Sequence, residues 1–248
     1  MRPNLFILGA ARCGTSSLHA ILGQHPEIHT SKFKEPTFFV GHGQIVKSPI
    51  AYFKLFDSPK RYRMDSSVSY FFCPETAPVL RDVFPDARFI VSMRNPKARA
   101  YAMYRHMRYA ELEDIPDFAE ALEAEAYRAT SKEFMWTAHF AVPSYLYCRS
   151  TLFDELLARY FSLFDRRQFY ILTLAELTKD PVETIARILR FLDLDPAPAQ
   201  HFDYSIRGSS KLSYEPYDAK SDQIMSSQFE GLTQRTDELV GRSLDWSV

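Results

Sequence analysis

The chain has 248 residues, 46% of them hydrophobic, and its 30 Lys and Arg against 31 Asp and Glu give a net charge of −1. This length and composition fit one α/β domain with a substantial core, so we expect a single domain over residues 1–248. The near-neutral charge argues against nucleic acid as a partner, because a long polyanion would gain no overall attraction.

Membrane segments and cysteine-based sites are not indicated. No stretch approaches the roughly 18 consecutive apolar residues that a transmembrane helix requires, and the apolar start of the chain runs directly into a glycine loop. The three cysteines include no C-x-x-C pair, which indicates neither a disulfide framework nor a zinc site. We therefore expect a cytoplasmic protein without membrane contacts.

Three short apolar runs, each followed by a helical pattern, predict the fold class. The strands are expected at 4–8 (NLFIL), 88–93 (RFIVSM) and 168–173 (QFYILT). The helical patterns follow at 15–25, 98–112 and 180–192. Pro96 is expected to open the second helix, and the third has Asp180 as N-cap and Pro181 at its first position. Repeated strand–loop–helix units imply an α/β fold, a parallel sheet with helices on both faces.

Further helices are expected between and after these units. The stretches 116–129 and 144–164 have helical patterns and would wall the site or cover the sheet. A short C-terminal helix carries Leu239 and Val240 on one side, and Trp246 is expected to anchor the tail that follows it.

The loop GAARCGTSS (9–17) predicts a phosphate site between the first strand and its helix. Gly9 and Gly14 bracket four residues as in G-x-x-x-x-G-K-[ST], but Thr15 stands at the lysine position and Arg12 is the cation nearby. Free N–H groups and the helix dipole favour an anion there. The alternative is a tight turn that only caps the helix. Cys13 is expected to fill the loop as a small residue rather than act as a thiolate.

Two other stretches carry charged candidates. Arg94 directly follows the strand 88–93, at the same rim as the glycine loop, and would meet a second phosphoryl group unless it is an ordinary surface arginine. No aspartate ends that strand, so Mg²⁺ has no obvious ligand. Lys34 and Glu35 precede two phenylalanines, and Glu35 is a candidate general base or half of a solvated surface pair.

Taken together, these stretches resemble the sulfotransferases that use 3′-phosphoadenosine-5′-phosphosulfate (PAPS), especially the carbohydrate and heparan-type branch and its bacterial relatives. The motif [KR]-x-G-T-[ST]-[ST] matches residues 12–17, K-E-x-x-[FY]-F matches 34–39, and R-[DN]-P matches 94–96. The resemblance covers nearly the whole chain and implies a P-loop-like fold related to nucleotide kinases. Because the sulfo group carries less charge than a phosphoryl group, such a loop does not need the missing lysine.

The resemblance also implies roles for individual residues. Glu35 would be the general base, with Arg12 and Lys34 as further catalytic residues, and no metal would take part. PAPS, with 3′-phosphoadenosine 5′-phosphate (PAP) as its product, would be the cofactor. The implied cofactor-binding residues are Arg12, Cys13, Gly14, Thr15, Ser16, Ser17, Arg94, Arg207 and Lys211.

The chain departs from the family pattern at two positions. Ala102 stands where the 3′-phosphate motif usually has a serine, and we expect Ser92, Arg99, or Arg207 with Lys211, to compensate. Ser66 stands where heparan-type relatives have a lysine, whose role Lys34 or Arg12 would then carry.

The acceptor is expected to be a small hydroxyl compound or a saccharide. No cluster of Lys and Arg extends beyond the nucleotide region, which argues against a long sulfated polysaccharide. His106 is the histidine expected near the cleft. Two alternatives stay open: a P-loop kinase or NTPase that needs Mg²⁺, and a nucleotide-binding protein without catalysis. Aromatic residues expected around the acceptor are Phe38, Phe39, Tyr52, Phe53, Tyr70, Phe71, Tyr101 and Tyr104, most of them as core.

Overall fold

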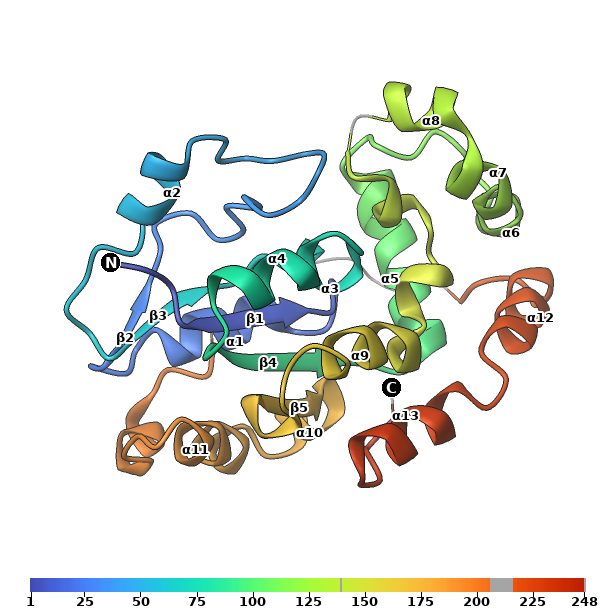
Figure 1. The fold of residues 1–248 in the computed structure, drawn as a ribbon. Coiled ribbons are helices and arrows are strands. Elements are labelled where there is room, and N and C mark those ends of the chain that lie inside the picture. Colours follow the sequence, from blue (N-terminus) through green and yellow to red (C-terminus); the bar gives the residue numbers. More distant parts are fainter. Residues whose placement is uncertain (139, 206–215, 248) are drawn as a thin grey trace.

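The computed structural model describes residues 1–138, 140–205 and 216–247. Five parallel strands form one sheet in the order β2-β3-β1-β4-β5, and helices cover both of its faces (Figure 1). The predicted α/β class is confirmed. The strands are β1 (Leu5–Gly9), β2 (Ile28–Thr30), β3 (Tyr62–Asp65), β4 (Arg88–Met93) and β5 (Phe169–Thr173).

The three strands predicted from apolar runs form β1, β4 and β5, whereas β2 and β3 were not predicted. β2 has only three residues, and β3 reads Tyr-Arg-Met-Asp, which is no apolar run. β3 exists because it pairs with β1 on one side, Leu5 opposite Met64, and with β2 on the other. Such pairing between distant segments leaves little trace in local sequence.

The two faces of the sheet bury different side chains, as the alternation along a strand requires. In β1, Phe6 and Leu8 pack with α3, α4, α5 and α9, whereas Leu5 and Ile7 pack with α1, α10 and α11. α1 and α5 therefore lie on opposite faces although they follow neighbouring strands, which opens a crevice at the carboxyl ends of β1 and β4. These helices are α1 (Thr15–Leu22), α3 (Ser69–Phe72), α4 (Thr76–Val83), α5 (Pro96–Tyr109), α9 (Phe153–Phe161), α10 (Leu174–Lys179) and α11 (Pro181–Phe191).

Local signals start two of the helices at the positions expected. Asn95 caps α5, its side chain accepting from the Ala98 amide at 3.2 Å, and Asp180 caps α11 before Pro181. α10 was not predicted, and it begins with a capping box between Thr173 and Glu176. The remaining elements are α2 (Pro49–Lys54), α6 (Phe118–Glu123), α7 (Glu125–Thr130), α8 (Lys132–Thr137), α12 (Ala219–Gln228), α13 (Leu232–Val240), η1 (Val142–Tyr145), η2 (Arg149–Thr151), η3 (Arg166–Gln168) and η4 (Ala197–His201).

The expected helix over 144–164 is wrong in its first half. Residues 142–145 and 149–151 form the 3-10 turns η1 and η2, and only 153–161 are α-helical. The cause is tertiary: the amides of Cys148 and Arg149 donate to the buried carboxylate of Glu125 at 2.6 and 3.2 Å rather than to preceding carbonyls. The stretch 116–129 is helical, divided into α6 and α7.

The C-terminal tail is anchored by Trp246, as predicted. Its indole Nε1 donates to Asp237 Oδ1 at 3.0 Å, and its ring stacks on Phe153 with centroids 6.1 Å apart. Its backbone carbonyl accepts from Asn95 Nδ2 at 3.2 Å, so the tail closes against the start of α5. Within the described ranges, no helix has both the length and the apolar character required to cross a bilayer.

Candidate nucleotide and acceptor site

A cleft of about 1060 Å³ lies along the carboxyl edge of the sheet. Its lining residues follow the ends of all five strands: the loop after β1, Lys34 and Glu35 after β2, Val68 after β3, Arg94 after β4 and Leu174 after β5. The sheet topology therefore brings together the three stretches that the sequence indicated. His106, on α5, also lines the cleft, as expected.

The phosphate loop, residues 9–17, meets the cleft at the N-terminus of α1. Gly14, Thr15, Ser16 and Ser17 all line it. Gly14 is the N-cap, with φ 79°, and a Cβ there would lie 2.8 Å from Leu174 Cδ1. Glycine is thus favoured chiefly by the positive φ, and a larger residue would also push the end of the Leu174 side chain aside. The first turn of α1 carries the positive end of the helix dipole without a capping side chain on Gly14, an arrangement that suits an anion.

β4 and α5 support the phosphate loop from beneath. The amide of Ala10 donates to the Ser92 carbonyl at 2.6 Å, and Ser92 Oγ donates to the Cys13 carbonyl at 2.6 Å. The guanidinium of Arg99 is fully buried and donates through Nε to the Ala11 carbonyl at 3.3 Å. Neither Ser92 nor Arg99 lines a described cavity. Ser92 and most of the Arg99 guanidinium are used in the fold, while Arg99 Nη2 has no partner among the described residues. That these two residues replace a 3′-phosphate contact stays a prediction.

Arg12 and Cys13 point to different surroundings. Arg12 lines the cleft, with φ 68°, and its Nε has no hydrogen-bond partner among the described residues. Cys13 Sγ is buried. Burial raises the pKa of this thiol to about 12, although the positive charges of Arg99, Arg94 and Arg12 act to lower it. Cys13 is thus a packing residue, and any contact with a ligand would come from its backbone.

Lys34 and Glu35 form an ion pair inside the cleft. Lys34 Nζ lies 2.7 Å from Glu35 Oε1, and the two side chains are 23% and 31% exposed. The lysine fixes the direction of the carboxylate, while Oε2 lies outside this pair. Glu35 and Thr37 both have positive φ, 65° and 49°. The surrounding structure must hold this loop, because non-glycine residues adopt that conformation at a cost.

Asp65, at the end of β3, is the hub of the contacts that hold this loop. Tyr52 and Tyr70 donate to Asp65 Oδ2 at 2.7 and 3.1 Å, and Ser67 donates to Oδ1. Ser67 Oγ and the Tyr70 hydroxyl in turn accept from the amides of Thr37 and Phe38, both at 3.0 Å. Burial raises the pKa of Asp65 to about 6, although these hydrogen bonds favour its charged form.

The two departures from the family pattern lie in the interior. Ala102 is 1% exposed in α5 and lines neither described cavity. Ser66 Oγ is hydrogen-bonded to His19 Nδ1 at 2.8 Å. Burial and the nearby charge of Lys34 lower the pKa of His19 to about 4, so this imidazole is neutral at pH 7. The position of the missing lysine is therefore next to a neutral histidine, and Lys34 is the cation at this part of the cleft.

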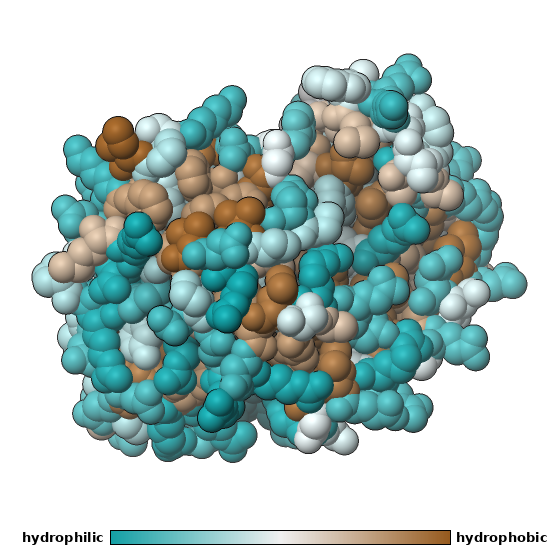
Figure 2. Space-filling model, viewed as in Figure 1, coloured by the Kyte–Doolittle hydropathy of each residue, from teal (hydrophilic) through white to brown (hydrophobic). Residues whose placement is uncertain are grey.

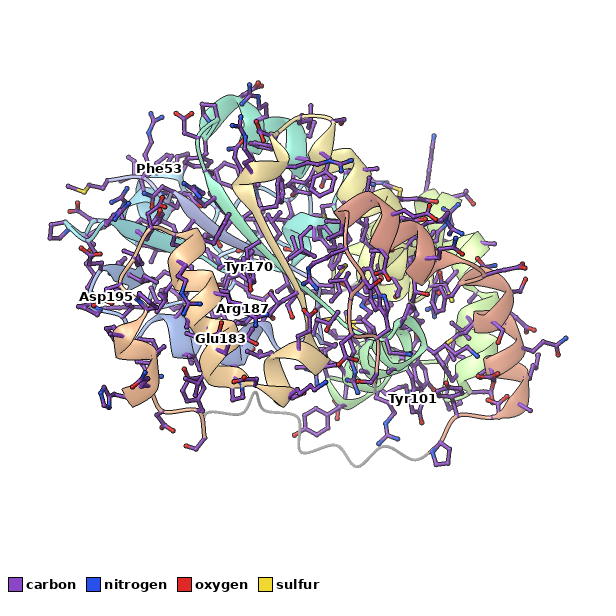
Figure 3. The ribbon with its side chains drawn as sticks, turned by 90° about the horizontal axis from the view of Figure 1, so that it is seen from below. Phe53, Tyr101, Tyr170, Glu183, Arg187 and Asp195 are labelled. Atoms are coloured by element: carbon purple, nitrogen blue, oxygen red, sulfur yellow. The ribbon has the colours of Figure 1, made fainter. Side chains whose placement is uncertain are left out.

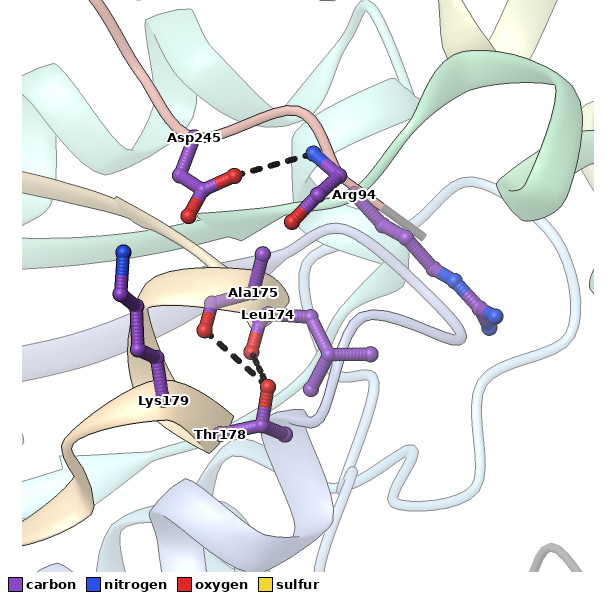
Figure 4. Close-up of a pocket in the computed structure, with 7 residues that line it drawn as sticks. Arg94, Leu174, Ala175, Thr178, Lys179 and Asp245 are labelled. Atoms are coloured by element: carbon purple, nitrogen blue, oxygen red, sulfur yellow. Dashed lines mark hydrogen bonds between the residues drawn. The ribbon is translucent and has the colours of Figure 1, made fainter.

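A second cavity of about 540 Å³ adjoins the cleft beside α10. It shares Arg94, Leu174 and Thr178 with the cleft and is closed by Lys179 and Asp245. Figure 4 shows the Arg94 side chain extending away from Asp245, whose Oδ1 accepts from the Ser247 amide at 3.1 Å. Arg94 thus borders both cavities. Arg207 and Lys211 lie outside the described residues.

The aromatic residues expected around the acceptor do not line the cleft. Phe53 and Tyr101 lie well apart, on different sides of the molecule (Figure 3), and Tyr52 and Tyr70 belong to the Asp65 contacts. Sequence reasoning missed several residues that do line it, most of which lie on or next to α3, α5 and η1. A predicted strand over 62–65 would have indicated that the residues after it reach the cleft. The missed residues include Val68, Ser69, Phe72, Met103, Met107, Phe140 and Ser144.

Comparison with known proteins decides the family. The sulfotransferase domain family matches residues 2–228. The chain belongs to the sulfotransferase family. A sulfotransferase from Alicyclobacillus acidocaldarius is 30% identical, with a TM-score of 0.78 over 98% of both chains. The resemblance inferred from the three motifs is therefore confirmed, and family and fold support a transferase.

Two mouse relatives of the sulfotransferase domain are heparan sulfate enzymes. Bifunctional heparan sulfate N-deacetylase/N-sulfotransferase 4 is 25% identical over 86% of this chain, and the match spans only 24% of that protein. Heparan sulfate glucosamine 3-O-sulfotransferase 5 is 21% identical over 98% of this chain and 74% of its own length. Mouse sulfotransferase SULT7A1, solved in complex with PAP, shares the fold, with 15% identity and a TM-score of 0.58 over 95% of this chain and 86% of that one.

Proposed function

We propose that this sulfotransferase moves a sulfo group from PAPS to a hydroxyl group of a small molecule or saccharide. The observation that carries the proposal is the cleft, in which the phosphate loop, Arg12 and Arg94 face the same space as the Lys34–Glu35 pair. An anion cradle beside a directed carboxylate is the arrangement that a transfer to a hydroxyl needs.

The residues present fit the nucleotide. Gly14 starts α1 at a positive φ without a side chain that caps the free amides, and Arg12 brings a buried Nε without a partner in the described chain. Residues 14–17 would hold the 5′-phosphosulfate, and Arg94 would hold the 3′-phosphate. Arg207 and Lys211 are proposed to close the nucleotide site. When bound, PAPS supplies the sulfo group that is transferred.

The chain's own residues would carry out three tasks. Glu35 would accept the proton of the acceptor hydroxyl as its oxygen attacks in line and forms the new bond to sulfur. Lys34 would hold the Glu35 carboxylate in place. Arg12 would offset the charge that develops on the leaving phosphate as the S–O bond to it breaks, a task for which its planar fork is suited.

Ligand-induced stabilisation tests the donor. PAP, the nucleotide found with the same fold in mouse SULT7A1, should raise the melting temperature without metal, because a ligand at about 100 times its Kd adds roughly 2.7 kcal/mol. ATP with Mg²⁺ should have no such effect. Stabilisation by Mg²⁺–ATP and not by PAP would instead support the kinase or NTPase alternative.

Glu35→Gln tests catalysis apart from binding. The amide keeps the size of the side chain but cannot accept the proton, so turnover should fall roughly a hundredfold or more. PAP binding should be unchanged. Glu27→Gln, an exposed acid that does not line the cleft, is the matched control. Undiminished turnover in Glu35→Gln would remove this residue from the mechanism and leave the non-catalytic alternative open.

A further inference from the structure

Part of the cleft lining is apolar. It comes from α3 and the residue before it, from the C-terminal half of α5 and the turn after it, and from the segment entering η1. Figure 2 shows the surface hollowed between the part that carries α2 and the part that carries α8, with apolar residues on both sides. We call its buried and half-buried apolar side chains the apolar wall: Val68, Phe72, Met103, Met107, Leu112 and Phe140.

In the described part of the chain, few cationic side chains line the cleft, and none of them belongs to the apolar wall. Of the described residues, the Lys and Arg side chains that line it are Arg12, Lys34 and Arg94, which belong to the phosphate loop, the Glu35 ion pair and the end of β4. His106 borders the apolar wall. Burial and the charge of Arg12 lower the pKa of its imidazole, although Glu35 acts to raise it, so His106 adds no positive charge at pH 7. A polyanionic acceptor would find no counter-charge along this wall.

Two hydroxyl groups in this part of the cleft have no partner. Ser69, on α3, is 4% exposed, and Ser144, on η1, is fully buried. Both residues line the cleft, and neither Oγ has a hydrogen-bond partner within the described chain. Buried hydroxyl groups are normally paired, and two unpaired ones in the lining of one cleft point to a polar atom that a ligand brings.

We propose that the apolar wall of the cleft binds an uncharged, mainly apolar alcohol or phenol, one further polar atom of which is met by Ser69 and Ser144. The inference rests on the proposed function and specifies its acceptor. The acceptor oxygen forms the new bond to sulfur, the donor's S–O bond breaks, Glu35 takes the proton, and PAP is released. The acceptor class then differs from the glycan for which the two mouse relatives are named.

A matched set of acceptors tests the proposal on the full chain with PAPS as donor. 2-Naphthol and a dihydroxynaphthalene represent the proposed class, and a heparosan tetrasaccharide and its N-sulfated form represent glycans. Sulfated products are measured by mass spectrometry. We expect kcat/KM to be at least roughly a hundredfold higher for the naphthols. The proposal would be overturned if the saccharides were sulfated and neither naphthol was.

Two exposed isoleucines provide a variant and its control. Ile45 lines the mouth of the cleft and is 61% exposed, whereas Ile50 is 82% exposed on α2 and does not line it. Ile45→Lys should lower kcat/KM for 2-naphthol roughly tenfold, the scale of a disturbed apolar pocket. Ile50→Lys should leave it within about twofold of the unmodified chain. Equal values for the two variants would contradict the role of this rim.

The serines are tested by the difference between the two naphthols. Ser144→Ala should reduce the preference for dihydroxynaphthalene over 2-naphthol roughly tenfold, because only the former offers a second polar atom. An unchanged preference would refute the role of Ser144. PAP-induced stabilisation, measured in every variant, separates the two proposals: a chain that fails to bind PAP contradicts the proposed function, whereas one that binds PAP and sulfates only glycans contradicts the acceptor class alone.

Discussion

Tyr70 links the buried Asp65 to the loop that carries Glu35. Its hydroxyl donates to Asp65 Oδ2 at 3.1 Å and accepts from the Phe38 amide at 3.0 Å. Glu35 lies three residues before that amide, in a backbone conformation with φ 65°. A carboxylate at the end of β3 thus determines where a candidate base after β2 is held, through one phenol group.

Removal of that phenol hydroxyl should impair turnover more than nucleotide binding. Tyr70→Phe leaves the Phe38 amide without its acceptor and frees the Glu35 loop, so we expect turnover to fall roughly tenfold or more and PAP affinity to stay within about twofold. Tyr62→Phe is the control, because its buried hydroxyl donates to the Leu192 carbonyl at 2.9 Å, away from the cleft. Similar turnover in both variants would contradict the positioning role.

Gly14→Ala should weaken PAP binding by about tenfold or more, because the new Cβ would meet Leu174 Cδ1 at 2.8 Å and strain a backbone at φ 79°. Gly241→Ala is the control for strain alone, since its φ is 82° and no atom lies within 4 Å of the added Cβ. Isothermal titration of both variants with PAP checks this. If Gly14→Ala binds as tightly as the control, the loop does not approach the nucleotide closely.

Arg99→Lys should destabilise the fold and loosen the phosphate loop. The Arg99 Nη1 donates to Ser150 Oγ at 2.6 Å and Thr151 Oγ1 at 2.9 Å, while Nε reaches the Ala11 carbonyl. A single lysine ammonium cannot reach both the η2 hydroxyl groups and the Ala11 carbonyl. We therefore expect a loss of about 2–4 kcal/mol in the free energy of unfolding.

Arg99→Lys should also lower the affinity for PAP, because the phosphate loop loses its contact with Arg99. Arg88→Lys, at the opposite end of β4, should lose stability without losing affinity, because Arg88 contacts the Phe191 carbonyl rather than the loop. Denaturant unfolding and PAP titration on both variants provide the two readouts. Unaltered affinity in Arg99→Lys would limit Arg99 to a structural role.

His19 should make the protein acid-sensitive below pH 6.5. Its pKa is lowered from 6.5 to about 4 in the folded chain, so the unfolded chain takes up this proton first as the pH falls. Stability is therefore lost between pH 6.5 and 4. His19→Asn removes this titration, and between pH 7 and pH 5 it should lose about 1–2 kcal/mol less than the parent. An identical pH dependence of unfolding would show that His19 titrates normally.

Local sequence patterns of a few neighbouring residues were enough to predict part of the fold and part of the candidate site. The apolar runs of β1, β4 and β5, the Asn95–Pro96 and Asp180–Pro181 helix starts, and the three motifs of the cleft could all be recognised in the sequence. They are legible because strand burial, helix capping and a glycine at positive φ each impose a requirement on local residue types.

Packing between distant segments decided the rest. Ser92 and Arg99 became supports of the phosphate loop, Glu125 broke the expected helix over 144–164, and β3 formed through its neighbours. The apolar wall and its two unpaired serines lie on or next to α3, α5 and η1, which are far apart in the chain. A residue's type states what it could bind, but whether its side chain is used inside the fold or faces the cleft depends on contacts that only the folded chain creates.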